Sequence, residues 1–382
     1  MTLTLGSVGA TYGGLTGKSG KDFGHGAGYY VTFTEVMAAS RLSGRSLERV
    51  DVHRHERQHE VRRGDVLFNG SSETPDEVAL GAVIDFDVPR GVYLNSFCFG
   101  YRLTRPNQVD PTYLAYFFRS AVGRDIVFGL AQGATRYNIA KTKLLKTPLD
   151  LPSYDQQKVV AVALTQVDDL IASLERLITK KRAVKRGMMQ ELLTGRTRLP
   201  GFVGEWVSIR LGSLLTVRNG RSQRDVEVAS GRYPILATGG EIGRTNTAIY
   251  TKPSVLIGRK GTIDRPQYQE TPFWTVDTLF YTEVGSRADA RYLYYLCTTI
   301  DWMSLNEATG VPSLTGKRIE SVEVFVPGID EQQAIAAVIG DADAEILALE
   351  RRLEATRDIK QGMMQELLTG RTRLPVDEEM MV

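Results

Sequence analysis

One string of fourteen residues occurs twice in this chain, and it constrains the fold more than any other feature of the sequence. The string GMMQELLTGRTRLP fills 187–200 and returns unchanged at 362–375, an offset of 175 residues. The register extends upstream, because Asp155-Gln-Gln answers Asp330-Glu-Gln. Each copy is therefore about 45 residues long, and such a repeat predicts two related structural units.

Both copies carry the hydrophobic pattern of a coiled-coil helix, with apolar residues at alternating spacings of four and three. Polar breaks at Lys181 and Lys185, matched by Thr356 and Lys360, favour a specified register over a continuous core. We therefore predict that the two helices pair antiparallel; the alternative is that each packs separately on its own domain. The predicted seam residues are Val160, Leu164, Val167, Ile171, Leu174, Ile178, Ile335, Ile339, Ile346, Leu349 and Leu353.

The ends of both helices have sequence signals. A proline precedes each helix, an aspartate follows as an acceptor for first-turn N–H groups, and Thr-Gly supplies the stop. These residues are Pro152 and Pro327, Asp155 and Asp330, and Thr-Gly at 194–195 and 369–370. At 1.5 Å per residue, some 40 helical residues would extend over about 60 Å.

The remaining sequence forms two segments rich in short β-type runs and glycine turns. Their apolar runs recur: Leu5-Gly-Ser answers Leu211-Gly-Ser, and Tyr113-Leu-Ala-Tyr answers Tyr292-Leu-Tyr-Tyr. The polar stretches between these runs differ, as expected of one fold with two binding specificities. The expected division is 1–152 and 201–329 for the β-rich domains, 153–200 and 330–375 for the helices, and 376–382 for a tail.

The expected fold class is therefore α+β, with two β-rich domains separated by two long antiparallel coiled-coil helices that a pseudo-twofold axis relates. A content of 42% hydrophobic and 24% charged residues fits a chain that folds throughout. Cys98 and Cys297 each lie in an apolar run and are expected to be buried free thiols. No basic leader or apolar run of about 18 residues is present, so we expect a cytoplasmic protein without a membrane partner.

Basic residues gather in turn-like sequence, although the formal net charge of +2 decides nothing by itself. Between 210 and 265 there are ten Lys or Arg against four acidic residues. Side chains in such turns could contact phosphates and guanine edges, but solvated loop charges would look the same. The DNA-binding candidates are Lys18, Lys21, Arg136, Tyr137, Arg218, Arg221, Arg224, Arg259, Lys260 and Arg265.

Two motifs imitate catalytic sites. His55-Glu-Arg-Gln-His59 matches the HExxH zinc motif, but its flanks are charged and no apolar helical face surrounds it. Gly17-Lys-Ser resembles the end of a phosphate-binding loop, yet Tyr12 occupies the place of the first glycine. We therefore expect neither catalytic nor metal-binding residues, and two related modules without a catalytic set favour a binding and positioning subunit.

The string LLTGRTRLP, followed by Gly-Phe in its first copy, ends a heptad helix that Asp-Gln-Gln opens, and it recurs once with a β-rich domain before each copy. This pattern resembles specificity subunits of type I restriction-modification systems. The resemblance implies two target recognition domains, each reading half of a bipartite site in the major groove of double-stranded DNA. It implies that the paired helices act as a ruler for the gap between the halves.

The same resemblance implies partners that carry the chemistry. Two methyltransferase subunits would use S-adenosylmethionine to methylate a flipped-out adenine in each half-site. Restriction subunits would use ATP and Mg²⁺ to translocate and cut DNA. This chain would bind none of these cofactors and would not be an enzyme.

One departure concerns the two ends of the chain. The first domain begins at Leu5-Gly without a counterpart of Gly204-Glu-Trp206, whereas the sequence continues beyond Pro375. We expect the tail, 376–382, to occupy the place of the missing lead-in. Three other interpretations stay open: the recognition module of a fused restriction-methylation enzyme, a coiled-coil scaffold without DNA specificity, and a zinc protease using His55 and His59.

Overall fold

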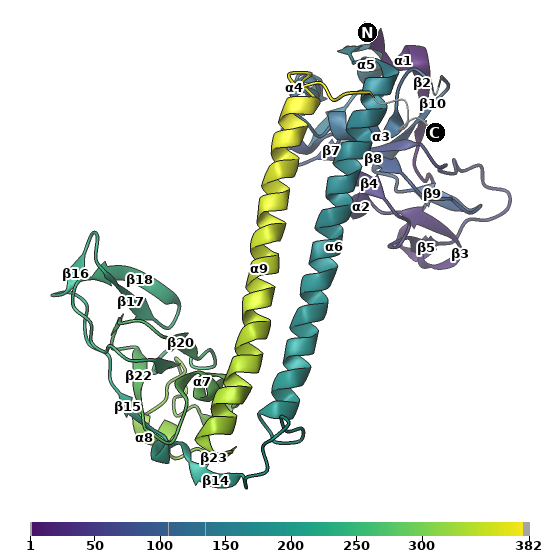
Figure 1. Ribbon diagram of the computed structural model, residues 1–382. Coiled ribbons are helices and arrows are strands. Elements are labelled where there is room, and N and C mark those ends of the chain that lie inside the picture. Colours follow the sequence, from purple (N-terminus) through teal and green to yellow (C-terminus); the bar gives the residue numbers. More distant parts are fainter. Residues whose placement is uncertain (1, 106, 134, 377–382) are drawn as a thin grey trace. The chain divides into compact units, whose positions relative to one another are not determined.

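A computed structural model describes residues 2–105, 107–133 and 135–376, and two compact units divide the chain. Unit 1 consists of Met1–Leu174 and Arg352–Val382, and unit 2 of Glu175–Arg351. The predicted long helices are present as α6 (Tyr154–Leu192) and α9 (Ile329–Leu367), each of 39 residues (Figure 1). Because the division falls within both helices, each unit holds the beginning of one helix and the end of the other.

Unit 1 has a five-stranded sheet of order β2-β10-β6-β8-β4 and two three-stranded sheets, β5-β3-β9 and β11-β12-β7; β1 and β13 form a further antiparallel pair. Its strands are β1 (Thr2–Thr4), β2 (Gly9–Gly13), β3 (Phe23–Val31), β4 (Arg41–Leu42), β5 (Glu48–Val50), β6 (Val66–Asn69), β7 (Ser71–Ser72), β8 (Gly81–Ile84), β9 (Val92–Leu94), β10 (Cys98–Leu103), β11 (Ala131–Gln132), β12 (Tyr137–Ile139) and β13 (Pro148–Asp150). Its short helices are α1 (Leu5–Val8), η1 (Gly20–Asp22), α2 (Phe33–Ala38), η2 (Pro75–Glu77), α3 (Pro111–Phe117), α4 (Ala121–Phe128) and α5 (Lys141–Lys146).

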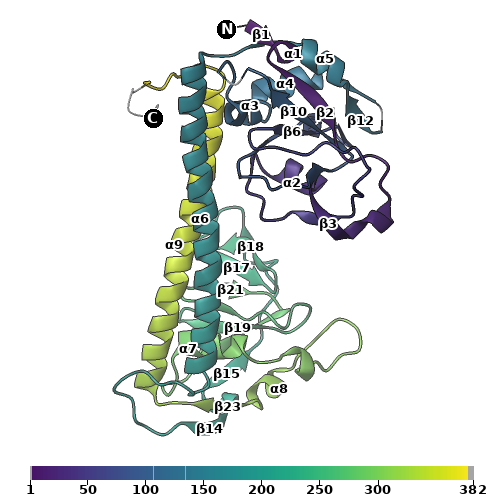
Figure 2. The same cartoon turned by 90° about the vertical axis from the view of Figure 1, so that its right-hand side faces the viewer.

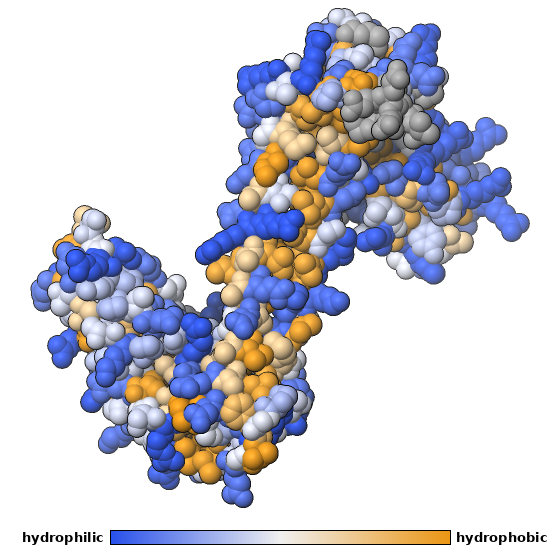
Figure 3. Space-filling view, in the orientation of Figure 1, coloured by the Kyte–Doolittle hydropathy of each residue, from blue (hydrophilic) through white to orange (hydrophobic). Residues whose placement is uncertain are grey.

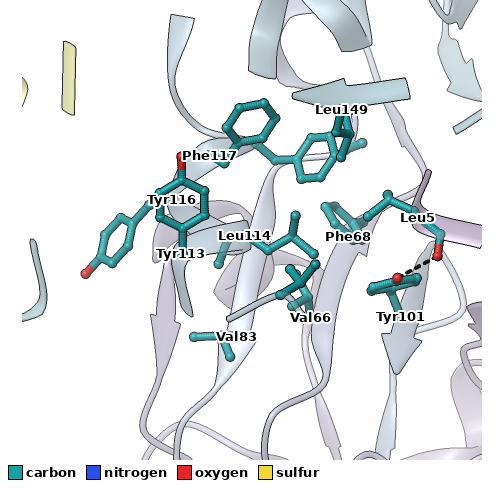
Figure 4. Close-up of a cluster of buried hydrophobic side chains, with 14 of the residues drawn as sticks. Leu5, Val66, Phe68, Val83, Tyr101, Tyr113, Leu114, Tyr116, Phe117 and Leu149 are labelled. Atoms are coloured by element: carbon teal, nitrogen blue, oxygen red, sulfur yellow. Dashed lines mark hydrogen bonds between the residues drawn. The ribbon is translucent and has the colours of Figure 1, made fainter. Parts of the chain in front are cut away.

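The core of unit 1 lies between its five-stranded sheet and helix α3 (Figure 4). Phe68 of the sheet and Leu114 of α3 are fully buried there. Tyr101 is also buried, and its hydroxyl donates to the Leu5 carbonyl oxygen over 2.7 Å. Leu164 near the start of α6 and Leu367 at the end of α9 complete the same cluster. Both long helices therefore belong to the hydrophobic core of this unit.

Unit 2 has two four-stranded sheets, β15-β22-β19-β20 and β16-β18-β17-β21, together with the antiparallel pair β14 and β23. Its strands are β14 (Val207–Arg210), β15 (Leu215–Arg218), β16 (Glu227–Val228), β17 (Tyr233–Ala237), β18 (Gly240–Thr245), β19 (Ser254–Gly258), β20 (Gln267–Gln269), β21 (Trp274–Thr275), β22 (Leu279–Val284) and β23 (Glu323–Val326). Its short helices are η3 (Leu211–Ser213), α7 (Ala290–Thr298), η4 (Met303–Leu305) and α8 (Gly316–Glu320), and α7 lies beside the first half of α9 (Figure 2).

The two units repeat one framework. In unit 1 β10 lies between β2 and β6, and in unit 2 β22 lies between β15 and β19 in the same antiparallel arrangement. Helices α3 and α7 start at matching caps, because Asp110 and Asp289 each accept a hydrogen bond from the backbone N–H three residues later. The recurrence of apolar runs in the sequence thus corresponds to a recurrence of structure.

The predicted seam residues of the long helices are all buried or half-buried. Leu349, Leu353, Val167 and Ile171 are half-buried, and the buried members are Val160, Leu164, Leu174, Ile178, Ile335, Ile339 and Ile346. The first turns of each helix pack into the core of their own β-rich domain, where the end of the other helix joins them. Packing on the domain and pairing between helices therefore occur together in each unit, and do not exclude each other.

The helix ends follow the predicted stops more closely than the predicted caps. Gly195 and Gly370 have φ values of +69° and +72°, the left-handed conformation that ends a helix and favours glycine. At the start of α6 the acceptor is Ser153, whose Oγ receives the Gln156 N–H over 3.4 Å. Asp155 occupies the first turn, where its negative charge interacts favourably with the positive end of the helix dipole. At the start of α6 the side-chain acceptor is thus Ser153, two residues before the predicted Asp155.

A buried glutamine joins each β-rich domain to the start of its long helix. Gln157 Oε1 accepts the backbone N–H of Asp110 over 3.0 Å, and its Nε2 donates to the carbonyl oxygens of Gln108 and Pro152. Gln332, which corresponds to Gln157 at the 175-residue offset, accepts the backbone N–H of Asp289 over 3.0 Å. The glutamine thus connects the start of α3 to α6 in unit 1, and the start of α7 to α9 in unit 2.

A three-residue cluster joins three elements in each unit. In unit 1 the Tyr116 hydroxyl of α3 donates to Asp168 Oδ2 of α6 over 2.6 Å, and Lys360 Nζ of α9 lies 2.6 Å from Asp168 Oδ1. The hydrogen bond to Asp168 and burial together raise the pKa of Tyr116, with burial the larger cause. The Lys360 ammonium also lies 5.8 Å from the centre of the Tyr116 ring.

The corresponding cluster in unit 2 consists of Tyr295, Asp343 and Lys185. The Tyr295 hydroxyl of α7 donates to Asp343 Oδ2 over 2.8 Å, and Lys185 Nζ of α6 pairs with Asp343 Oδ1. The Lys185 ammonium lies 5.5 Å from the centre of the Tyr295 ring. Of the polar residues that interrupt the two seams, Lys185 and Lys360 therefore form ion pairs between the helices, and each pair is bonded to a tyrosine of the adjacent domain.

The end of the second repeat reaches the first domain. The Leu374 carbonyl oxygen accepts a hydrogen bond from Gln156 Nε2 over 2.9 Å, and the Leu374 side chain packs against the unit 1 core. In unit 2 the matching Leu199 packs against the core, and Arg198 beside it forms two hydrogen bonds with Glu331. The tail expected to replace the missing lead-in, apart from Val376, lies outside the described residues.

The surface differs between the helices and the β-rich domains. In Figure 3 polar and charged side chains cover much of the visible face of each domain, whereas apolar side chains gather along the helices. No helix within the described parts of the chain is long and apolar enough to cross a membrane.

Candidate nucleic-acid interface

Three backbone segments meet at one point in unit 1. The Gly70 N–H donates to the Phe97 carbonyl oxygen over 2.8 Å, which joins the end of β6 to the turn before β10. The Ile139 N–H then donates to the Gly70 carbonyl oxygen over 3.2 Å, which adds the end of β12. Residues 69–72, 95–97 and 135–139 thus form what we call the loop junction of unit 1.

The same meeting of segments occurs in unit 2. The Arg259 N–H donates to the Thr278 carbonyl oxygen over 2.8 Å, and the Leu314 N–H donates to the Arg259 carbonyl oxygen over 3.0 Å. The loop junction of unit 2 therefore consists of residues 258–261, 276–278 and 309–314. By these hydrogen bonds, positions 70, 97 and 139 of unit 1 correspond to positions 259, 278 and 314 of unit 2.

A glycine allows a close backbone approach at each junction. A Cβ atom on Gly14 would lie 2.0 Å from the Asn95 carbonyl oxygen, and one on Gly220 would lie 2.0 Å from the Val276 carbonyl oxygen. Both distances are far too short for any side chain, so this backbone arrangement requires glycine at both positions. The two junctions therefore share backbone geometry over a fourth segment as well.

The side chains at the unit 1 junction combine an arginine with an exposed aromatic ring. Arg136 is exposed, and its guanidinium carbon lies 5.2 Å from the centre of the Phe97 ring, which is itself 56% exposed. Arg136 Nε donates to Ser71 Oγ over 3.3 Å. Tyr137, beside it, is half-buried. The arrangement offers a cation held in place on an aromatic surface.

The unit 2 junction presents two exposed cations. Arg259 Nη1 donates to the Asp277 carbonyl oxygen over 3.2 Å. Lys260 forms an isolated antiparallel β-bridge with Ser313 through its backbone, and its side chain is exposed. Arg259 and Lys260 thus lie at positions that Gly70 and Ser71 occupy in unit 1.

The other candidates of unit 1 lie away from this junction. Lys18 Nζ pairs with Glu56 Oε1 over 2.6 Å, and the Lys18 side chain is only 4% exposed. The hydrogen bond from Lys18 is the largest cause that lowers the pKa of Glu56 to about 2. Lys18 is therefore engaged within its own domain and is a poor phosphate ligand, whereas Lys21 in η1 is exposed.

The remaining candidates of unit 2 differ in their contacts. Arg218 pairs with Glu283 over 2.8 Å at the end of β15. Arg221 is exposed, while its backbone N–H donates to Thr275 and fixes the loop that follows Gly220. Arg224 and Arg265 are exposed. The ten sequence candidates therefore do not form one cluster, and only Arg136, Tyr137, Arg259 and Lys260 belong to a loop junction.

Two junction residues were not found from the sequence. Phe97 stands in the polar turn Asn95-Ser-Phe, and an aromatic residue in such a turn is the one available signal. Asn69 is completely buried: its Oδ1 accepts the Leu80 N–H over 2.7 Å, and its Nδ2 donates to the Glu77 carbonyl oxygen. Asn69 therefore orders the loop that follows β6, which no spacing in the sequence could reveal.

The catalytic look-alikes adopt other structures. Residues 53–62 contain turns and no helix, so the two histidines of the HExxH match are not presented on one helical face. The rings of His53 and His55 stack 5.6 Å apart between centres. Over the described ranges, no group of three or more His, Cys, Asp or Glu residues could hold a metal ion. Cys98 and Cys297 are free and buried, as predicted.

Comparison with known proteins finds one family. The model described as the type I restriction modification DNA specificity domain matches residues 61–181 and 204–356. The specificity subunit of the type I restriction enzyme MjaX from Methanocaldococcus jannaschii is 25% identical over 94% of this chain and 90% of its own length. The MjaVIII specificity subunit of the same organism is 20% identical over 82% of this chain and 80% of its own length.

Solved structures agree at the level of the fold. The S subunit of a type I restriction-modification system from M. genitalium has a TM-score of 0.64 at 16% identity, over 96% of this chain and 95% of that one. A chain from a study of assembly and conformational transition of a type I system has a TM-score of 0.53 at 17% identity, over 96% and 97%.

Proposed function

The chain belongs to the family of type I restriction-modification DNA specificity domains, and from this premise we propose that each β-rich domain reads one half of a bipartite site in duplex DNA. The single observation that carries the proposal is the loop junction. Two domains with one backbone arrangement present different side chains at corresponding positions, as expected of two readers with different targets.

The chemistry of the junctions suits DNA. Arginine and lysine contact phosphates, and an arginine fork can also read a guanine edge in the major groove. Arg136 in unit 1, and Arg259 and Lys260 in unit 2, are exposed cations at these junctions. Contacts of both kinds would give an affinity that depends on salt and a preference that depends on sequence. A scaffold without specificity would show the first property alone.

We propose further that the paired long helices set the spacer between the two half-sites. In unit 1 the pair Asp168 and Lys360, and in unit 2 the pair Asp343 and Lys185, support an antiparallel pairing with a defined register. A helix of 39 residues extends over about 59 Å at 1.5 Å per residue. Helix length then determines the separation of the two recognised half-sites.

The long helices also carry features of a partner-binding surface. Six large apolar side chains on them are exposed: Val162, Leu170, Leu177, Val184, Leu347 and Ile359. Where exposed apolar side chains lie together, they commonly mark protein interfaces. We propose that this surface binds two methyltransferase subunits, and that restriction subunits join the assembly. S-adenosylmethionine, ATP and Mg²⁺ would then be bound by those partners, while this chain selects the site and catalyses no step.

Methylation mapping tests the proposal. The chain is expressed with its partner methyltransferase in a host without other adenine methylation, and methylated adenines are mapped over the genome. We expect one bipartite motif with a constant spacer, and no motif when the specificity chain is omitted. Methylation without any sequence preference, together with salt-sensitive binding to every duplex, would instead support the scaffold. A catalytic region in the same reading frame would support the fused enzyme.

A further inference from the structure

We propose that Arg136 in unit 1 and Arg259 in unit 2 are the base-reading side chains of the two domains, each donating its guanidinium fork to a guanine of one half-site. This inference rests on the proposed function in DNA recognition, and it adds which residue reads and what kind of base edge is read.

Both guanidinium groups lie against the same turn of their domain. Arg136 is positioned over the ring of Phe97, the last residue of the turn 95–97. Arg259 donates to the carbonyl oxygen of Asp277, the middle residue of the corresponding turn 276–278. The hydrogen bonds of the junction establish the correspondence of these turns, because Gly70 N–H binds Phe97 and Arg259 N–H binds Thr278 in the same way.

The two arginines reach this common place from different segments. Arg136 belongs to the segment before Ile139, whereas Arg259 directly follows β19. Since Ile139 corresponds to Leu314, the unit 2 counterpart of Arg136 is Val311, and the unit 1 counterpart of Arg259 is Gly70. Each junction thus contains one arginine, delivered from a different position. The two arginines therefore do not descend from one residue of the duplicated domain. A common function at the junction explains better why each domain places an arginine there.

The contacts of both arginines leave donors for a ligand. A guanidinium has five N–H donors, and two of them can bind O6 and N7 of guanine together. In the contacts that the structure describes, Arg136 uses Nε toward Ser71, and Arg259 uses Nη1 toward Asp277. One protein contact fixes a guanidinium without occupying all its donors, which lowers the entropic cost of binding a base.

The other basic candidates fit this role less well. The guanidinium of Arg218 is paired with Glu283, and the ammonium of Lys18 with Glu56. Lys260 is exposed at the junction, but an ammonium lacks the planar fork and suits a phosphate better. Arg221, Arg224 and Arg265 are exposed but lie outside the three segments that define the junction. Arg136 and Arg259 therefore combine exposure, a fixed position and the required donor geometry.

Substitutions at the two arginines, assayed in the full chain with its methyltransferase, test the assignment. A duplex library that varies each position of both half-sites is methylated by wild type, R259A, R259K, R136A and R136K. We expect R259A to reduce discrimination at one guanine of one half-site by about 10- to 100-fold, and R136A to do so in the other half-site alone. Lysine keeps the charge without the fork, so R259K and R136K should not restore discrimination.

Two exposed arginines outside the junctions serve as matched controls. R232A in unit 2 and R90A in unit 1 remove the same charge, and both should keep the wild-type base preferences. Circular dichroism and thermal melting establish that every variant folds. If R259A abolishes methylation, the base preference of R259K at the same half-site position tests the assignment instead. Wild-type discrimination in R259K and R136K, or a change in both half-sites at once, would overturn the assignment. Absence of a bipartite motif in the wild type would instead overturn the proposed function itself.

Discussion

At the residue scale, Gln157 and Gln332 show how one buried side chain can connect two elements. Gln157 is fully buried and bonds the backbone at Asp110, Gln108 and Pro152. Gln332 makes the matching contacts in unit 2, including one to the Pro327 carbonyl oxygen over 2.9 Å. Backbone groups buried in this way cannot turn to water if the side chain is removed, so each would remain unpaired.

We therefore expect Q332A to destabilise unit 2 by about 1 to 3 kcal/mol, because it leaves buried backbone groups without partners. Hydrogen exchange of amides in α7 and the first turns of α9 measures this loss. The neighbouring Q333A is the control, since Gln333 is exposed and surface substitutions change stability by about 0.5 kcal/mol or less. Equal exchange rates in Q332A and Q333A would contradict the bridging role.

Both cysteines are free and buried, and burial makes their thiols unreactive. Burial raises the pKa of Cys98 and of Cys297 to about 12, from an ordinary value of 9.0. The folded state therefore favours the neutral thiols. The two buried thiols therefore contribute fully to the free energy of unfolding below about pH 9. This contribution is lost as the pH rises from about 9 through about 12, because the unfolded state then releases the thiol protons first.

At pH 8 we expect neither thiol to react with a thiol reagent in the native protein, because only the thiolate is nucleophilic. Both should react at once in denaturant. Because Cys98 lies in unit 1 and Cys297 in unit 2, labelling followed by peptide mapping reports the opening of each unit separately. Rapid labelling of either cysteine without denaturant would show that its burial is not maintained in solution.

At the element scale, the two long helices contact each other through apolar seam residues and also through charged side chains. Asp168 with Lys360, and Asp343 with Lys185, connect the helices, while Tyr116 and Tyr295 add the adjacent domains. A shift of one heptad would separate both carboxylates from the lysines and remove the three-residue clusters. Polar residues in a coiled-coil seam commonly specify register in this way, at some cost in stability.

A double-mutant cycle measures this register specification. D168N and K360M in combination should show a coupling free energy of about 1 kcal/mol in the stability of unit 1, because the two side chains are in direct contact. The corresponding pair in unit 2 is D343N with K185M. The cross combination of D168N with K185M serves as the control, and its effects should add within about 0.5 kcal/mol. Coupling in the cross combination as large as in the matched pairs would contradict two separate clusters.

At the scale of the whole molecule, the repeat makes the helix length the variable that the proposed ruler depends on. Deletion of 173–179 and 348–354 removes one heptad from each helix at matched positions and retains both Tyr-Asp-Lys clusters. Seven residues shorten a helix by about 10 Å, which equals about three base pairs at 3.4 Å each.

Methylation mapping of this deletion variant should therefore find a shorter spacer between unchanged half-sites. Because the retained clusters and seam keep the helices paired, the variant is expected to fold, and circular dichroism checks that its helix content falls only by the deleted residues. A matched control removes a heptad from one helix alone, which breaks the register and should abolish methylation. An unchanged spacer in the symmetric variant would contradict the ruler.

The sequence by itself determined the elements that depend on local pattern. The twice-written string, its four-and-three spacing and its Thr-Gly stops predicted both long helices, because a helix seam and a left-handed glycine are local requirements. The recurring apolar runs predicted two copies of one β-rich framework. The lysine breaks in the seams indicated a defined register, although their partners could not be read from the spacing.

Only the tertiary structure decided which distant residues meet. It paired Lys360 with Asp168 and Lys185 with Asp343, and it engaged Lys18 with Glu56. It also placed Arg136, Arg259 and Lys260 at the loop junctions and the other basic candidates elsewhere. Loop residues follow no period that a sequence pattern could reveal, because contacts between strands and across turns set their positions. Local sequence patterns therefore predict the long helices and the duplication, whereas hydrogen bonds between distant backbone segments define the two loop junctions.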